Sequence, residues 1–223
     1  MIIVIDGPAG SGKSSTAKAL SKLLNIHFLD SGALYRAVTL YWIQRGKPDK
    51  NSFFDLLPDM NLDVDLADNS FSVWLNGANV SDDIRSSKVA NHVSDIASLP
   101  KVRKTVNAFM HNLVKEDTFI ADGRDLGTAV FPDADLKFFM DASIEERADR
   151  RFREMKASGH TITRERVIEN LKERDHKDQN RAADPLKKAD DAVVIDTTGK
   201  TFEEQVAEMA SIIREKLNLN TQL

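Results

Sequence analysis

The chain has 223 residues, of which 41% are hydrophobic, 30% are charged and none is cysteine, and its formal net charge is −4. This length suffices for one domain with insertions, and the lack of cysteine excludes disulfides and thiolate metal sites. The mildly acidic charge argues against a dedicated nucleic-acid binder, which is expected to be basic. Without a signal-peptide pattern or an apolar run of roughly 18 residues, we expect a soluble, cytoplasmic protein with no membrane partner.

Five short apolar runs, each bounded by Asp, Gly or Ser, predict buried β-strands. They lie at residues 2–5, 27–29, 118–121, 136–140 and 192–195. Helix-length segments with a 3.6-residue apolar period alternate with them, at residues 13–24, 32–45, 101–116, 144–157, 164–176 and 201–217. This alternation predicts an α/β fold, a three-layer sandwich with a parallel five-stranded core sheet.

One stretch interrupts the alternation between residues 60 and 100. Two runs with a period of two, 62–66 and 71–75, are followed by Asn76-Gly77, a pair typical of a type I′ turn. They predict a small antiparallel meander with a helix near 82–97 as its companion. We therefore expect an insert in the core rather than a separate domain.

The strongest chemical signal is a phosphate-binding loop (P-loop) between the first strand and the first helix, fitting G-x-x-x-x-G-K-[ST]. Its glycines let backbone N–H groups turn toward a phosphate, Lys13 can reach the β and γ oxygens of a triphosphate, and the Ser14 hydroxyl can ligate Mg²⁺. A Gly-rich turn that binds nothing is the alternative, and the flanking strand and helix disfavour it. The predicted phosphate-binding residues are Gly7, Pro8, Ala9, Gly10, Ser11, Gly12, Lys13, Ser14 and Ser15.

Further polar residues follow the second and third strands. Ser31 is predicted as the N-cap of the second helix, which places Arg36 one turn later, where it could face a second phosphate. The carboxyl ends of parallel strands are where ligands bind in open α/β sheets, so Asp122, Arg124 and Asp125 are expected near the P-loop.

Several motifs in one order resemble those of the bacterial cytidylate kinase family. The resemblance covers residue 2 to about 198 and is carried by Ile5-Asp6-Gly7-Pro8, Asp30-Ser31-Gly32-Ala33 with Tyr35-Arg36, Ile120-Ala121-Asp122-Gly123-Arg124-Asp125, Val130-Phe131-Pro132-Asp133-Ala134, and Lys172-Glu173-Arg174-Asp175 with Asn180-Arg181. It implies a P-loop kinase that moves the γ-phosphoryl group of ATP, with Mg²⁺, onto CMP or dCMP. It also implies a monomer, and the mildly acidic charge gives no reason to expect a nucleic-acid partner.

The resemblance further implies roles for individual residues. The phosphate of CMP would be held by Arg36, Arg124 and Arg181, its ribose by Arg174 and Asp178, and its cytosine by Ser94, Arg103 and Asp125, with Ser31 also in the CMP site. Arginine suits phosphate because its planar fork binds two oxygens at once. Lys13, Arg124, Arg150 and Arg181 would be catalytic, Arg150 and Arg153 would reach ATP from a helical lid, and Asp122 would orient metal-bound water.

The resemblance implies a single kinase domain over residues 1–223. Its core comprises residues 1–30, 101–145 and 190–217, with a monophosphate-binding insert at about 31–100 and a lid at about 146–180.

Other functions stay open at this point. Another small-molecule P-loop kinase, acting on AMP, UMP or a sugar acid, or a non-enzymatic nucleotide-dependent switch would carry the same loop. A guanine-specific GTPase is disfavoured because no Asn-Lys-x-Asp motif follows a late strand. Glu146 and Arg150 are i,i+4 partners, so the proposed lid could instead be a solvated, ion-paired helix face.

Overall fold

A parallel five-stranded sheet forms the centre of the protein in a computed structural model that describes residues 1–67, 70–157, 159 and 161–217. The strand order is β2-β6-β1-β7-β8, and all four pairings are parallel. The strands are β1 (Ile2–Asp6), β2 (His27–Asp30), β6 (Phe119–Asp122), β7 (Leu136–Asp141) and β8 (Val193–Asp196). Each lies within one residue of its predicted bounds, so the predicted parallel sheet is confirmed.

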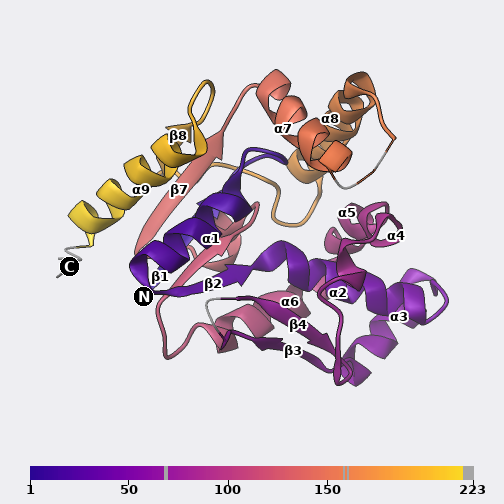
Figure 1. The fold of residues 1–223 in the computed structure, drawn as a ribbon. Helices are drawn as coiled ribbons and strands as arrows, with labels where there is room; N and C mark the ends of the chain where they lie inside the picture. Colours follow the sequence, from indigo (N-terminus) through magenta and orange to yellow (C-terminus); the bar gives the residue numbers. More distant parts are fainter. Residues whose placement is uncertain (68–69, 158, 160, 218–223) are drawn as a thin grey trace.

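Helices cover both faces of this sheet, because its central strands are apolar on both sides (Figure 1). On one face Ile3 and Ile5 pack against α1 (Lys13–Leu24) and α9 (Phe202–Lys216). On the other face Val4 packs against α2 (Ser31–Gln44) and α6 (Pro100–Leu113). Successive strand residues point to opposite faces, which makes one strand serve two cores and gives the predicted three layers.

Two further helices, α7 (Ile144–Ala157) and α8 (Arg164–Asn180), pack against one another at one end of the molecule (Figure 1). They occupy the segment predicted as the lid, whose residues 158 and 160 lie outside the described part of the chain. A short helix, α3 (Lys50–Leu56), was missed by the sequence because seven residues are too few for a periodic pattern. Its start is fixed by Asp49, whose carboxylate accepts hydrogen bonds from the amides of Asn51 and Ser52.

The predicted meander is present as β3 (Leu62–Asp65), β4 (Ser72–Leu75) and β5 (Ala78–Asn79). Asn76 and Gly77 join the last two strands with φ values of 50° and 81°, the left-handed pair that a type I′ turn requires. The prediction of one helix near 82–97 is wrong. The chain forms three short pieces there instead, namely η3 (Asp83–Arg85), α4 (Ser87–Ala90) and α5 (Val93–Ala97). The helix is broken because Ser86 has an extended backbone, with φ −60° and ψ 152°.

The carboxyl ends of the strands place polar groups along one edge of the sheet. Asp6, Asp30 and Asp122 end β1, β2 and β6 there, and the P-loop follows β1 directly. The loop leaves the sheet through Gly7, where an added Cβ would lie 2.0 Å from the carbonyl oxygen of Met140. A glycine is needed at this close approach, because any side chain would displace the neighbouring strand. In the described part of the chain, no helix has the length and apolar character to span a membrane.

Candidate nucleotide-binding and catalytic site

A cleft of about 730 Å³ opens at the carboxyl edge of the sheet, between the P-loop, helices α2 and α5, and helices α7 and α8. Most of the predicted site residues line it. They are Ala9, Gly10, Gly12, Lys13, Ser14, Ser15, Ser31, Arg36, Ser94, Asp122, Arg124, Asp125, Arg150, Arg153, Arg174, Asp178 and Arg181. Gly7, Pro8, Ser11 and Arg103 are not among the lining residues. One cavity therefore collects the two groups of residues, from the P-loop and from the arginine-rich segments, that the sequence assigned to two phosphate-bearing ligands.

The P-loop is shaped for an anion. Gly10 and Gly12 have φ values of 78° and 93°, and Gly12 begins α1 with no side chain capping its first amides. The first N–H groups of a helix carry partial positive charge, so an anion is stabilised there. Lys13 is buried and donates from Nζ to the carbonyl of Pro8 at 2.7 Å and to Ser11 Oγ at 3.3 Å. Burial and the nearby Arg124 guanidinium hold the pKa of Lys13 well below its usual range. A bound anion would compensate the positive charges of both side chains.

Arg147 and Asp175 support the P-loop from the lid helices. Arg147 Nη1 donates to the carbonyl of Ala9 at 2.8 Å, and Asp175 Oδ1 accepts from the Ala9 amide at 3.2 Å. The two side chains also pair with one another, with Nη1 and Oδ2 2.6 Å apart. No local sequence pattern gives either residue a role of its own, because the contact joins positions that are far apart in the chain.

Arg150 lies between the P-loop and the end of the sheet. Its Nη1 donates to the carbonyl of Ser11 at 3.3 Å and to Thr197 Oγ1 at 2.9 Å, and its Nη2 donates to the Thr197 carbonyl at 2.8 Å. Glu146 Oε2 is more distant, at 3.9 Å from Nη2. The solvated, ion-paired face therefore does not account for Arg150. Arg153 is exposed at the rim of the same cleft.

Asp122 and Ser14 form an oxygen-rich pair beside the P-loop. Ser14 Oγ donates to Asp122 Oδ2 at 2.5 Å, and Asp122 Oδ1 is buried with no hydrogen-bond partner in the described structure. Burial, followed by the neighbouring Asp30 carboxylate, raises the pKa of Asp122 to about 7. A buried carboxylate that has one unpartnered oxygen and shares its other oxygen with a hydroxyl is a suitable place for a cation or its bound water.

The predicted N-cap of α2 is wrong. Asp30 takes that position, since its backbone is extended and its carboxylate accepts from the Ala33 amide at 2.8 Å. Ser31 is the first helical residue, and its Oγ instead donates to the carbonyl of Asp122 at 2.6 Å. This bond ties α2 to the end of β6, the strand that delivers Asp122 to the cleft.

A cluster of arginines lines the cleft away from the P-loop. Arg174 Nε is buried without a hydrogen-bond partner in the described structure, and burial, followed by the charge of Arg124, lowers the pKa of Arg174 to about 9. Arg124 Nε donates to Asp178 Oδ2 at 3.1 Å, and Arg36 Nη1 donates to the carbonyl of Ile84 at 3.3 Å. Guanidinium groups this close repel one another, so the cluster favours a polyanionic ligand.

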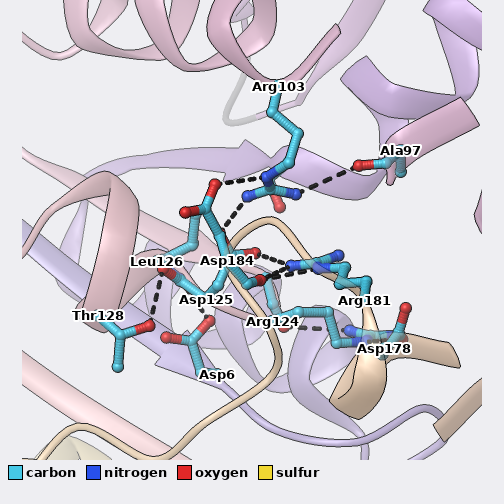
Figure 2. A network of polar contacts seen from close by, with 12 residues as sticks. Asp6, Ala97, Arg103, Arg124, Asp125, Leu126, Thr128, Asp178, Arg181 and Asp184 are labelled. Atoms are coloured by element: carbon cyan, nitrogen blue, oxygen red, sulfur yellow. Dashed lines mark hydrogen bonds and ion pairs between the residues drawn. The ribbon is translucent and has the colours of Figure 1, made fainter. Parts of the chain in front are cut away.

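A closed ring of charges lies behind the arginine cluster (Figure 2). Asp125 pairs through Oδ2 with Arg103 Nη2 and through Oδ1 with Arg181 Nη2, the second at 2.6 Å. Arg103 Nε also pairs with Asp184 Oδ2 at 2.6 Å, and the Asp184 carbonyl accepts from Arg181 Nε at 2.7 Å. Arg103 is therefore fully buried behind Asp125, whereas Asp125 lines the cleft.

Asp6 holds the segment that carries Asp125 in place. Its carboxylate accepts from the amides of Leu126 at 3.0 Å and Gly127 at 2.7 Å, and burial raises its pKa from 3.8 to about 6. A folded-state pKa above the unfolded value means that the native protein binds the proton more tightly, so this contribution to stability is complete below pH 3.8 and is lost as pH rises through about 6.

We expect Asp6 to make the free energy of unfolding fall by about 2 kcal/mol between about pH 4.5 and 7. In Asp6→Asn this part of the pH dependence is expected to vanish, because the amide does not titrate. Urea unfolding across that pH range measures both slopes. The exposed carboxylate Asp55, changed to Asn, is the control and should keep the wild-type slope. Parallel wild-type and Asp6→Asn curves would contradict the prediction.

Several lining residues were not predicted from the sequence. Arg151 lies in the same arginine-rich segment as Arg150 and Arg153, and its place there could have identified it as a site residue. The segment after β8 carries no motif beyond the Thr201–Glu204 capping box, so only the fold brings it beside the P-loop. The missed residues are Asp30, Gly32, Tyr35, Arg85, Val93, Ala97, Gly123, Glu146, Arg151, Glu154, Leu171, Lys200, Thr201, Phe202 and Gln205.

Comparisons with known proteins agree with this geometry. The family model of cytidylate kinase matches residues 3–215. The chain is 43% identical over 219 residues to a cytidylate kinase from Clostridioides difficile, covering 98% of this chain and 99% of that one, and 41% identical over 218 residues to a cytidylate kinase from Pseudothermotoga lettingae, covering 98% and 96%. A solved structure of an uncharacterized protein from Eubacterium ventriosum has a TM-score of 0.52 at 14% identity, with 96% and 98% of the two chains covered, and so shares the fold. The match over nearly the whole chain shows that this protein belongs to the cytidylate kinase family.

Proposed function

We propose that this protein transfers the γ-phosphoryl group of ATP to CMP or dCMP, giving ADP and CDP or dCDP. The observation that carries the proposal is a single cleft with a P-loop on one side and, on the other, an arginine cluster beside the buried carboxylate of Asp125. Such a cleft can hold a triphosphate and a monophosphate close to one another. Membership of the cytidylate kinase family supports the choice of nucleotides.

In the proposed ATP site, the P-loop amides and Lys13 bind the β and γ phosphates. Lys13 would leave its contact with the Pro8 carbonyl for the phosphate oxygens, which offer more negative charge. Arg150 already lies against the Ser11 carbonyl, so a small movement of its guanidinium would bring it to the transferred group, with Arg153 at the rim. These cations stabilise the charge that develops on the equatorial oxygens.

In the proposed acceptor site, Arg36, Arg124 and Arg181 bind the phosphate of CMP, and Arg174 and Asp178, which line the same cleft, contact its ribose and the adjoining oxygens. Ser94, Arg103 and Asp125 are assigned to cytosine. Cytosine presents an amine donor beside two acceptors, so a carboxylate is complementary to the amine and a guanidinium to the acceptors. UMP presents an acceptor where cytosine has its amine and would be repelled by Asp125.

The residues beside the P-loop also fit Mg²⁺. Ser14 Oγ and the unpartnered Asp122 Oδ1 are hard oxygen donors, of the type that Mg²⁺ binds directly or through water. In the described residues no cluster of three or more acidic, His or Cys side chains could hold a metal, in keeping with an ion carried in largely by the nucleotide phosphates. When bound, Mg²⁺ would supply positive charge to the β and γ oxygens.

Catalysis in this proposal depends on positioning and charge neutralisation. The acceptor phosphate is already an ionised nucleophile, so no side chain has to remove a proton from it. Arg147 and Asp175 connect the P-loop to the proposed lid helices through Ala9. Closure of the lid over bound ATP would move Arg150 further toward the transferred group and exclude water that would otherwise hydrolyse ATP.

The alternatives differ in their acceptor. UMP offers no amine to the buried carboxylate of Asp125, and a nucleotide-dependent switch would leave the arginine cluster without an acceptor phosphate to bind. A kinase acting on AMP or a sugar acid is distinguished from a cytidylate kinase by the assay below. A cytoplasmic location and a monomeric state are further parts of the proposal. The chain contains no cysteine, as suits a reducing compartment.

A coupled assay of ADP release with CMP, dCMP, UMP, AMP and gluconate as acceptors tests the proposal. We expect turnover with CMP or dCMP to exceed that with UMP by at least about 100-fold, because the wrong base leaves buried polar groups unpaired. Equal turnover across the bases would overturn the base-reading assignment. ADP release that needs no acceptor would favour the switch.

A further inference from the structure

The loop after α8 carries a carboxylate, Asp184, to which the sequence motifs and the roles above assign no part in catalysis. We propose that Asp184 is a positioning residue for the acceptor nucleotide. It fixes Arg103, and through Arg103 it fixes the carboxylate of Asp125 that faces the cleft. This inference rests on the proposed function, in which Asp125 binds cytosine.

The contacts form a ring of four residues in which Asp184 takes part twice (Figure 2). Its Oδ2 accepts from Arg103 Nε at 2.6 Å, and its backbone carbonyl accepts from Arg181 Nε at 2.7 Å and Nη2 at 2.5 Å. Each guanidinium group also reaches Asp125. Arg103 Nη2 donates to Oδ2, and Arg181 Nη2, which also donates to the Asp184 carbonyl, donates to Oδ1. Both oxygens of Asp125 are thus held by arginines that Asp184 also holds.

Burial makes the balance of charge in this ring important. The side chains of Arg103, Asp125 and Arg181 are 2%, 5% and 7% exposed, whereas that of Asp184 is 37% exposed. Two arginines face two carboxylates, so the ring is neutral with Asp184 ionised. Without the Asp184 carboxylate, one buried carboxylate faces two buried guanidinium groups, an arrangement that is unfavourable in a poorly solvated site.

The orientation of Arg103 also depends on Asp184. Of the five N–H groups of a guanidinium, three donate here, to Asp184, to Asp125 and to the carbonyl of Ala97. The Ala97 contact is long, at 3.4 Å, so the two carboxylates set the plane of the group. With Asp184 removed, Arg103 could rotate about its contact with Asp125, and the Asp125 carboxylate would lose its fixed direction toward the cleft.

The backbone conformation of the loop fixes the position of the Asp184 carboxylate. Asp184 has φ 47°, a left-handed conformation that Asp tolerates better than most residues but that still costs free energy. The loop is closed by a hydrogen bond from the amide of Leu186 to the carbonyl of Asp178 at 2.8 Å, and Leu186 is buried. The loop therefore presents its carboxylate to Arg103, 81 residues away in the chain.

Three variants test the inference. Asp184→Asn removes the charge, Asp184→Gly removes the side chain while accepting the left-handed backbone, and Asp184→Glu keeps the charge. We expect the first two to raise the KM for CMP about tenfold and to lower the preference for CMP over UMP by a similar factor, with the KM for ATP unchanged. Asp184→Glu should recover part of both losses. Asp191→Asn is the matched control, because Asp191 lies in the same connection but pairs with Lys137, and it should behave as wild type.

Steady-state kinetics with both bases and thermal unfolding of each variant distinguish the outcomes. Folded Asn and Gly variants with wild-type KM and base preference would overturn the inference. So would a lowered Tm without any change in base preference, since that describes a purely structural residue. A wild-type enzyme that does not prefer CMP would overturn the proposed function and this inference with it, whereas a CMP-preferring wild type beside unaffected variants would overturn the inference alone.

Discussion

Replacing Lys13 by alanine is expected to lower kcat by about 100- to 1,000-fold with either CMP or dCMP as acceptor, the cost typical of removing one preorganised donor from a charged transition state. Lys13 is the cation inside the P-loop, buried at 4% exposure, and within the described part of the chain its Nζ donates to the Pro8 carbonyl and the Ser11 hydroxyl. Both contacts are weak competitors for a phosphate oxygen, so the lysine is available to the nucleotide.

Initial rates of ADP formation at saturating acceptor measure this loss, with circular dichroism to verify that the variant is folded. Lys18→Ala is the matched control, since Lys18 lies on the exposed side of the same helix and should leave turnover unchanged. A folded Lys13→Ala enzyme that kept more than about a tenth of wild-type turnover would place the transferred phosphoryl group away from this lysine.

Replacing Asp125 by alanine is expected to lower the preference for CMP over UMP by about 10- to 100-fold, the discrimination that a well-placed contact to a base edge provides. Binding of ATP should change much less, because Asp125 lies beside the acceptor arginines rather than in the P-loop. The ratio of kcat/KM for the two acceptors reports the first effect, and the KM for ATP reports the second.

The free energy of unfolding of each Asp125 variant has to be measured together with its base preference, because Asp125 neutralises Arg103 and Arg181 in a buried site. Its removal leaves two guanidinium groups without their shared partner, at a cost of roughly 3–5 kcal/mol. Asp125→Asn removes the same charge but keeps the shape and one acceptor oxygen. The exposed Asp63→Ala is the control for a lost surface carboxylate. A folded Asn or Ala variant with wild-type base preference would show that the carboxylate is misassigned.

Much of the fold follows from local patterns in the sequence. The core strands are short, predominantly apolar runs that end in Asp and are separated by helix-length amphipathic segments, so each was predicted to within a residue. The P-loop and the Asn76-Gly77 turn were also predicted from local sequence. Their backbone conformations depend on residues that readily adopt positive φ. The interrupted helix at 82–97 was not predictable in this way. Its residues Ile84, Val89, Val93 and Ile96 are buried in the core, and the i, i+4, i+7 spacing of the last three is the same for a continuous and for an interrupted helix.

The candidate site also has features that local sequence predicts and features that depend on the fold. By itself the sequence determined the chemistry, because the loop around Lys13 and the motif from Asp122 to Asp125 are contiguous and carry their conformation with them. Only the tertiary structure decided which of these groups face one another. Arg103, Asp125, Arg181 and Asp184 come from three separate parts of the chain and form one ring, and a pairing across 81 residues leaves no local pattern. Long-range contacts of this kind depend on how the helices pack against the sheet, which no short stretch of sequence encodes.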